Sequence, residues 1–466
     1  MTDAHDHPLH TRPGPEDFRR LLGLAVPIVL AQTGLMLMNV VDVMIVGRLS
    51  AAALGGVAIG TVWVFAFGAF GMGTLTVLDP IVSQAVGAKD EPAIARALQR
   101  GVFLAVILGL LCGLGMLPVR AVLTRLGQTP ALVDSAVPYA MIQAPGWPAF
   151  FLTVALRQTL LAMGRMRPIV TTVIVANVIN GVLAWALVFG KLGAPALGVM
   201  GAGLATMLVR WSMVAMLLAF AWRDLVPRLR ARVDAIQWAP IRRMLGLGLP
   251  IGFQYELETG VFATVALIMG HLGEVAASGH QVAINIASLT FMVPLGVSSA
   301  ASVMVGRAVG AGDAPAARRA SLASLGVGAG FMSLSALVLT LTPRLLARAY
   351  TPDLEVIAMA ATLIPIAGVF QVFDGLQVVS IGVLRGVGDT RTPMIVSLLG
   401  YWLIALPISL WLAFRAGLGP RGLWWGLAVG LMLVAVVLLT RVRARLWRPL
   451  ERLVIDHPPV PVQVTE

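Results

Sequence analysis

The sequence is poor in the residues that build most enzyme sites. Only one of its 466 residues is cysteine, so neither an intramolecular disulfide nor a cysteine-based zinc site can form. The two lysines, Lys89 and Lys191, follow no glycine-rich loop that could bind a nucleotide phosphate. Neither an H-E-x-x-H nor a G-x-S-x-G motif occurs. We therefore expect a protein that is not an enzyme, binds no cofactor and is not powered directly by ATP.

Charge is also scarce, and apolar residues take its place. Charged residues make up 12% of the chain, whereas a soluble domain carries about 25%. Hydrophobic residues make up 58%, and the mean hydropathy is +0.89. A run of about 20 apolar residues crosses a bilayer as a helix. About twelve such runs begin near residues 20, 51, 97, 131, 168, 198, 240, 275, 318, 354, 393 and 421. The sequence thus predicts an all-α polytopic membrane protein with twelve transmembrane helices.

The net charge of +12 is distributed as membrane topology requires. If the N-terminus is cytoplasmic, most arginines fall on cytoplasmic segments, in agreement with the positive-inside rule. The densest cluster lies at mid-chain and comprises Arg223, Arg228, Arg230, Arg232, Arg242 and Arg243. We expect both termini to be cytoplasmic, the basic segments to face anionic membrane lipids, and no nucleic acid to be bound.

The chain contains an internal repeat. LGLAVPI at residues 22–28 returns as LGLGLPI at residues 245–251, and 245 minus 22 gives an offset of 223. The same offset pairs AVGAKDEPA at residues 85–93 with AVGAGDAPA at residues 308–316. An even number of spans in each repeat gives both the same orientation. This predicts two six-helix bundles related by a pseudo-two-fold axis along the membrane normal, as in secondary transporters built from parallel repeats.

The repeat also predicts the domain boundaries. We expect a cytoplasmic N-terminal tail at 1–17, an N-terminal six-helix lobe at 18–222, an Arg-rich cytoplasmic linker at 223–239, a C-terminal six-helix lobe at 240–445 and a cytoplasmic tail at 446–466. In transporters of this class the substrate site lies between or within the bundles, which rock against each other.

Features of the helix ends and interiors recur in both halves. Gly87 and Gly310 are expected to close a helix, and Asp90 and Asp313 to cap the next one. Pro27 and Pro250 are expected to kink two equivalent helices. Such matched kinks are either bends that change shape during transport or static features needed for packing.

Five acidic residues fall within apolar segments: Asp42, Asp79, Glu256, Glu258 and Asp374. A charge at the membrane centre costs about 2.5–3.5 kcal/mol, so such residues are functional candidates by default, the alternative being a buried structural hydrogen bond. Asp42, Glu258 and Asp374 are the candidates we favour, whereas Asp79 precedes a proline and fits a structural role better. Glu256 and Glu258 lie about 200° apart around a helix, and we favour Glu258 as the cavity-facing one.

Amide side chains accompany the favoured acids at helical spacing. Asn39 precedes Asp42 by three residues, Gln371 precedes Asp374 by three, and Gln254 precedes Glu258 by four. An amide can hydrogen-bond a protonated carboxyl group or help to bind a bare cation. Three further residues on apparent polar or aromatic helix faces are candidates to line the cavity: Phe262, Gln281 and Asn285.

Two other acids stand at the expected outer starts of helices. Asp134 and Asp353 can be explained by the helix dipole, which favours negative charge at a helix N-terminus. For Asp353, a place in the substrate cavity remains an alternative.

Several stretches resemble one transporter family. LAVPIVLAQTGLMLMNVVDVMIVGRLS resembles the first helix of the multidrug and toxic compound extrusion (MATE) family, NorM-type branch. HQVAINIASLTFMVPLGVSSAASVMVGRAVGAGD resembles its helix 7–8 hairpin and the loop that follows, and FDGLQVVSIGVLRGVGDTRTP resembles its helix 10 and next loop. The resemblance extends from about residue 18 to about residue 445.

The resemblance implies a multidrug efflux transporter of the bacterial inner membrane. Such a protein exchanges inward Na⁺ or H⁺ for outward organic, often cationic compounds by alternating access of two lobes, and can confer antibiotic resistance. The family's coupling acids fall on Asp42, Glu258 and Asp374, and in a sodium-coupled protein Glu258 and Asp374 would bind Na⁺. Other family site positions fall on Asp353, Gln281, Phe262 and Asn180.

One departure from the family pattern bears on the cation site. Many members carry a second polar residue four positions after the asparagine that falls on Asn180, but this chain has Ala184. This favours the C-terminal pair, Glu258 and Asp374, over Asp42 as the cation site.

Two other functions remain open. A lipid-linked precursor flippase of the same wider superfamily would usually carry more helices and a more cationic cavity than this chain. A membrane scaffold or receptor that does not transport would show no gradient-dependent flux. We expect the protein to be a monomer.

Overall fold

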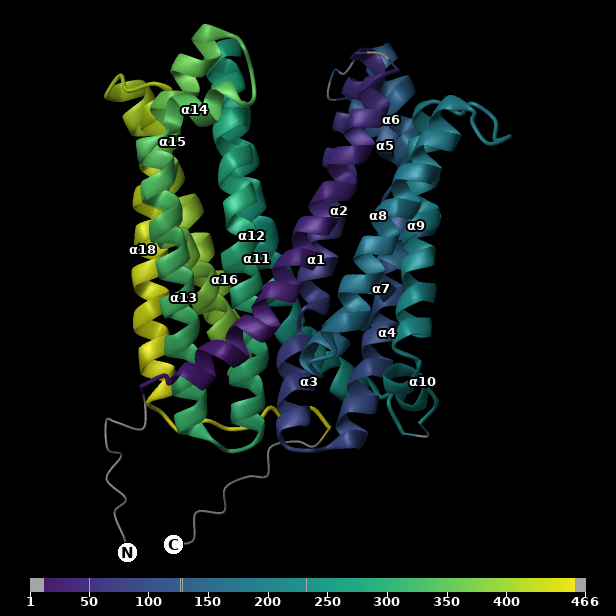
Figure 1. The fold of residues 1–466 in the computed structure, drawn as a ribbon, viewed down its shortest axis with the longest axis vertical. Coiled ribbons are helices and arrows are strands. Elements are labelled where there is room, and N and C mark those ends of the chain that lie inside the picture. Colours follow the sequence, from purple (N-terminus) through teal and green to yellow (C-terminus); the bar gives the residue numbers. More distant parts are fainter. Residues whose placement is uncertain (1–11, 50, 126, 128, 232, 457–466) are drawn as a thin grey trace, which may run out of the picture. The chain divides into compact units, whose positions relative to one another are not determined.

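The computed structural model describes residues 12–49, 51–125, 127, 129–231 and 233–456, and within these ranges every regular element is a helix (Figure 1). The predicted tails therefore lie partly outside the described residues, at 1–11 and 457–466. The elements of the first half are α1 (Pro15–Gly47), α2 (Ala51–Leu75), α3 (Leu78–Gly87), α4 (Glu91–Leu114), α5 (Val119–Arg125), α6 (Pro130–Ile142), η2 (Ala144–Gly146), α7 (Trp147–Ala162), α8 (Met166–Phe189), α9 (Val199–Phe220) and α10 (Trp222–Arg230).

The second half is helical in the same way. Its elements are α11 (Trp238–His271), α12 (Glu274–Gly310), α13 (Ala314–Leu341), α14 (Pro343–Arg348), α15 (Leu354–Gly386), α16 (Arg391–Ser397), η3 (Leu398–Ala405), α17 (Leu406–Leu410), η4 (Trp411–Arg415) and α18 (Pro420–Leu446). Searched over the described residues, the chain has nine helical segments that are long and apolar enough to cross a membrane. The prediction of an all-α polytopic membrane protein is confirmed.

The chain forms two compact units. The C-unit comprises residues 12–29, 87–89 and 253–453, and the N-unit comprises residues 30–86, 90–252 and 454–456. Helices α1 and α11 therefore each begin in one unit and end in the other. Pro27 and Pro250 lie inside these two helices. Each is two residues before the last residue of the unit in which its helix begins. A proline removes one helical hydrogen bond, so both helices are weakened close to that point.

Each unit is built by close helix packing. In the C-unit, α15 packs against α12, α13 and α18, around a core that includes Leu363 and Trp424. In the N-unit, α4 packs against α7, α8 against α9, and α2 against α6. The first part of α11 also belongs to the N-unit. A Cβ atom on its Gly252 would lie 2.5 Å from the Thr74 hydroxyl of α2, so this position has no room for a side chain.

The helices that flank the two repeated loops end and begin where the sequence predicted. Helix α3 ends at Gly87 and α12 at Gly310. The Asp90 carboxylate accepts a hydrogen bond from the Ala93 amide at 3.0 Å and so caps α4. Asp313 does the same for α13, accepting from the Ala316 amide at 2.8 Å. Both predicted caps are confirmed.

The eleventh apolar run of the sequence is not a regular α-helix. It spans Arg391–Arg415, and its segments η3 and η4 are π-helical. A π-helical segment contains an extra residue per turn and frequently occurs at functional sites. Here it positions Tyr401, which is fully buried.

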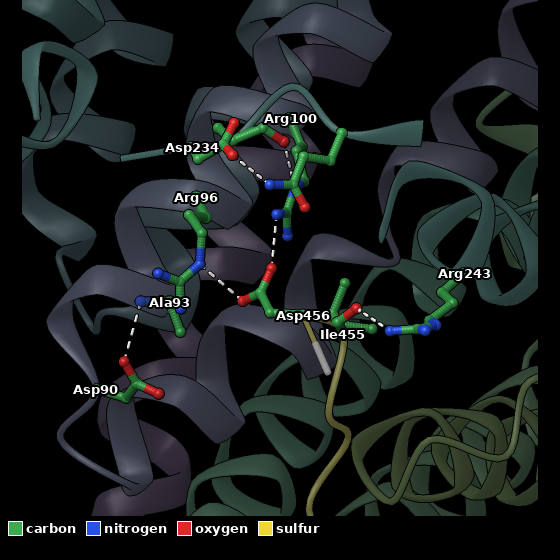
Figure 2. Close-up of polar contacts among 10 residues, drawn as sticks. Asp90, Ala93, Arg96, Arg100, Asp234, Arg243, Ile455 and Asp456 are labelled. Carbon is green, nitrogen blue, oxygen red and sulfur yellow. Dashed lines mark hydrogen bonds and ion pairs between the residues drawn. The ribbon is translucent and has the colours of Figure 1, made fainter. Parts of the chain in front are cut away.

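The C-terminal segment folds back onto the N-unit (Figure 2). The Asp456 carboxylate pairs with Arg96 at 2.7 Å and with Arg100 at 2.6 Å, both on α4. Arg243 of α11 donates to the backbone oxygen of Ile455 at 2.8 Å, and the Ile455 side chain is buried. Arg100 is itself only 2% exposed, so Asp456 provides the charge that this buried guanidinium needs.

Candidate functional site

The three favoured acids are divided between the two units. Asp42 lies in the N-unit, and Glu258 and Asp374 lie in the C-unit.

The N-unit site is centred on Asp42 of α1, which is 7% exposed. Asn180 of α8, fully buried, donates its side-chain amide to Asp42 Oδ1 at 2.6 Å. Thr206 of α9 donates its hydroxyl to Asp42 Oδ2 at 3.3 Å. Two of the sequence candidates, Asp42 and Asn180, are therefore in direct contact. Thr206 was not identified from the sequence, because one threonine in an apolar helix gives no signal.

A guanidinium group lies beside this site. Arg210 follows Thr206 by one turn of α9, and its charge interacts electrostatically with Asp42 and with Tyr139 of α6. Its guanidinium carbon lies 5.2 Å from the ring centres of Trp147 and Phe150. Nη1 of Arg210 is buried and finds no hydrogen-bond acceptor in the described part of the chain. The aromatic rings thus lie beside a guanidinium group that is partly buried, on the same side of α9 as the Asp42 site.

The C-unit site joins α11, α15 and the π-helical segment η3. The Tyr401 hydroxyl donates to Gln377 Oε1 at 2.6 Å, and Gln377 Nε2 donates to Glu258 Oε1 at 3.5 Å. Gln254 also hydrogen-bonds Glu258, as its spacing suggested. The charges of Glu258 and Asp374 interact electrostatically. Gln377 and Tyr401 were not predicted from the sequence, although Gln377 follows Asp374 at the helical spacing of three residues.

The C-unit site has excess negative charge. Asp374 is 7% exposed, and its buried Oδ1 finds no hydrogen-bond donor among the described residues. Arg385, 5% exposed, interacts electrostatically with Glu258. Because the site has two carboxylates and one guanidinium, one negative charge remains to be balanced when all three groups are ionised. A proton or one monovalent cation would balance it.

A cation here would be held mainly by oxygen atoms. Over the described residues, no group of three or more His, Cys, Asp and Glu side chains is arranged to hold a metal ion. Glu258 and Asp374 could bind Na⁺ only with help from neutral oxygens, such as those of Gln377 and Tyr401. Hard cations accept such amide and hydroxyl ligands.

The remaining polar candidates of the C-terminal half lie elsewhere. Gln371 donates to the backbone oxygen of Ala287 at 3.1 Å and accepts from Ser335 at 3.0 Å, so it ties α15 to α12 and α13. Its amide also bonds the Thr290 hydroxyl. Gln281 is exposed and donates to Asn285 at 3.2 Å on the same face of α12.

The other candidates have simpler surroundings. Phe262 packs against the apolar core of the C-unit. Asn39 is exposed on α1, whereas Asp42 is buried. Asp353 is exposed and caps α15, accepting from the amides of Glu355 at 2.9 Å and Val356 at 3.2 Å. Asp353 thus has the helix-start position that the dipole explanation requires.

Comparison with known proteins gives consistent matches. The MatE family model matches residues 27–186 and 250–411. The chain is 38% identical to a probable multidrug resistance protein NorM of Rhodopseudomonas palustris, covering 90% of each chain. It is 36% identical to the multidrug resistance protein NorM of Burkholderia vietnamiensis, covering 90% of this chain and 92% of that one.

Solved structures share the fold. An outward-facing multidrug resistance MATE family transporter of the MOP superfamily superposes with a TM-score of 0.84 at 19% identity, over 92% of this chain and 96% of that one. A eukaryotic MATE transporter superposes with a TM-score of 0.84 at 22% identity, over 92% of this chain and 99% of that one.

Proposed function

The chain belongs to the MatE family, and from this premise we propose that it is a multidrug efflux antiporter that couples outward drug transport to inward flow of Na⁺ or H⁺. The observation that carries the coupling chemistry is the acid pair of the C-unit, Glu258 and the buried Asp374, whose Oδ1 finds no hydrogen-bond donor among the described residues. The substrates we propose are organic cations, as expected for an acidic site.

Exchange follows from charge balance at the acid pair. In an apolar interior the acid pair can bind one positively charged ligand. A second one would be repelled by the first, because no water screens the two charges from each other. A coupling cation and a cationic drug therefore displace each other at Glu258 and Asp374. Each positive charge that moves inward releases about 2.3 kcal/mol per 100 mV of membrane potential. This energy can drive export of the drug.

We also propose a membrane arrangement for the transport cycle. We propose twelve transmembrane helices in two six-helix lobes, at 18–222 and 240–445, that alternate access across the plasma membrane. Both termini would be cytoplasmic, and the protein would act as a monomer. The acids Asp42, Glu258 and Asp374 are the proposed coupling residues, and among them Glu258 and Asp374 are the proposed cation-binding pair. The proposed cavity residues are Asp353, Gln281, Phe262, Asn180, Gln254, Gln371, Asn39 and Asn285.

The test is dye transport by purified protein in lipid vesicles. Efflux of a fluorescent organic cation is followed while sodium and pH gradients are imposed independently. We expect gradient-driven flux from the parent protein and at least a tenfold loss in Glu258→Gln and Asp374→Asn. Asp134→Asn is a matched control, because Asp134 is exposed and pairs only weakly with Arg120 at 3.1 Å. Parental flux in both acid variants would refute the site.

A further inference from the structure

We propose that the guanidinium group of Arg210 is a permanent positive charge of the N-unit site. It balances the negative charge of Asp42, so that no free coupling cation binds there. This inference rests on the proposed antiport function, because it decides which of the acids bind the coupling ion. Arg210 would thereby determine the number of ions exchanged per cycle, since only the C-unit acids would take one.

The helix geometry brings Arg210 to the side of α9 that faces Asp42. Thr206 donates to Asp42 at 3.3 Å, and Arg210 stands one turn later on the same face of α9. Asn180 approaches the carboxylate from α8 at 2.6 Å. Among the described residues, the charged or titratable groups that interact with Asp42 are Arg210 of α9 and Tyr139 of α6. The site thus contains one carboxylate and one guanidinium.

The surroundings hold the guanidinium in place. Trp147 and Phe150 lie in the first turn of α7, and their ring centres are 5.2 Å from the guanidinium carbon of Arg210. Aromatic faces stabilise a cation that has lost its water. Because an arginine does not lose its proton in proteins, this positive charge is permanent. A free cation entering the same site would have to lose its hydration shell and would then meet a like charge at short range.

The internal repeat shows that the arginine is specific to the N-unit. Helices α9 and α18 begin after equivalent glycines, Gly198 with φ 57° and Gly419 with φ 55°, and 419 minus 198 gives 221. This local offset pairs Arg210 with Leu431 of α18, where 210 plus 221 gives 431, so the C-unit has an apolar residue at the equivalent position. In the C-unit site, Glu258 interacts electrostatically with Asp374 and with Arg385, and two acids against one arginine leave negative charge that a bound cation can balance. The two halves therefore share a repeated sequence pattern but differ in the charge balance of their sites.

The test counts cations bound by the purified full-length protein in detergent. Bound ²²Na⁺ is measured by equilibrium dialysis, and proton uptake is measured with a pH electrode in weakly buffered solution. We expect Arg210→Met to bind one cation more than the parent, as Na⁺ or H⁺, because Asp42 has lost its partner. The double variant Asp42→Asn/Arg210→Met should return to the parental number.

Arg157→Met is the matched control. Arg157 lies in the same unit, on α7, and hydrogen-bonds Gln32 at 3.1 Å, so its loss removes an arginine charge away from Asp42. We expect the parental number of cations. If Arg210→Met is folded, as judged by a single symmetrical gel-filtration peak, but gains no cation, the proposal is wrong.

A second comparison keeps the proposal testable if Arg210→Met does not fold. Arg210→Lys keeps the charge and should bind the parental number of cations. Asp42→Asn alone should also bind the parental number, whereas loss of one cation in this variant would overturn the proposal. The antiport function itself is judged separately, from gradient-driven dye flux in the parent and in the Glu258 and Asp374 variants.

Discussion

At the level of single residues, the acid pair of the C-unit depends on neutral partners. Gln377 connects the Tyr401 hydroxyl to Glu258, with hydrogen bonds of 2.6 and 3.5 Å. Tyr401→Phe removes the hydroxyl and leaves the amide oxygen of Gln377 without its donor. A hydrogen bond of this kind contributes about 1 kcal/mol, which corresponds to roughly a fivefold change in a rate. We expect dye efflux to fall by about this factor.

The measurement is initial efflux rate in vesicles at fixed protein content. Tyr350→Phe is the control, because Tyr350 is about half exposed and lies outside the site. If Tyr401→Phe transports at the parental rate across the full range of sodium concentration and pH, the hydrogen-bond chain does not support Glu258.

Single residues also show what could be predicted from sequence. Asp42, Glu258 and Asp374 were identifiable because an ionisable group is costly in an apolar segment. Thr206 and Tyr401 carry no charge and gave no comparable signal. Gln371 and Gln377 both lie three residues from Asp374, yet Gln371 bonds α12 and α13 while Gln377 bonds Glu258. Each glutamine lies about 60° from Asp374 but on opposite sides of it, so the two are about 120° apart around α15, enough to direct them to different helices.

At the level of elements, the two repeated loops differ at one backbone position. Lys89 has φ 56° and Gly312 has φ 73°, and the repeat offset pairs them, since 89 plus 223 gives 312. A left-handed backbone disfavours any residue with a side chain. We therefore expect Lys89→Gly to stabilise the protein by about 0.5–1 kcal/mol and to raise its thermal denaturation temperature in detergent.

The reverse change in the other loop is the control. A Cβ on Gly312 would meet no atom within 4 Å, so Gly312→Ala changes only the backbone preference. We expect it to destabilise the protein by about 1 kcal/mol. A lower denaturation temperature in Lys89→Gly would show that the lysine side chain makes a contact worth more than the strain.

The helices and their caps were the most predictable part of the fold, whereas the π-helical segments and the ion pairs of the C-terminal segment were not predicted. The capping aspartates, Asp90 and Asp313, followed from the repeat and from known cap preferences. The π-helical segments at 398–405 and 411–415 did not, because a π turn and an α turn have the same apolar composition. The return of Asp456 to Arg100 was also not predictable, since it joins residues 356 positions apart, 456 minus 100.

At the level of the whole molecule, the repeat organises both the sequence and the family match. The two regions matched by the MatE family model begin at residues 27 and 250, and 250 minus 27 gives 223, the offset found in the sequence. The compact units do not follow the two repeats completely, because α1 and α11 each change unit along their length. Sequence periodicity could not reveal this, since it identifies helices but not the unit against which each part packs.

The prolines of α1 and α11 give the last prediction. Pro250 lies inside α11 just before residue 253, where the helix passes from the N-unit to the C-unit. If transport requires the two parts of α11 to bend relative to each other, replacing Pro250 by alanine will slow transport. The alanine restores the missing helical hydrogen bond and makes the helix more rigid at this point. We expect Pro250→Ala to lower the dye efflux rate severalfold and to leave the equilibrium affinity for the dye unchanged. Pro27→Ala should behave in the same way in α1.

Pro294→Ala separates bending from packing. Pro294 also lies inside a helix, α12, but α12 stays within the C-unit throughout. Efflux rate is compared with dye affinity, measured by fluorescence anisotropy, for all three variants. A loss of rate confined to Pro27→Ala and Pro250→Ala assigns the effect to the helices that change unit. An equal loss of efflux rate in Pro294→Ala, or a loss of dye affinity in all three variants, would instead mean that these prolines serve static packing. A helix that bends less easily slows the transport cycle but does not alter the dye-binding site.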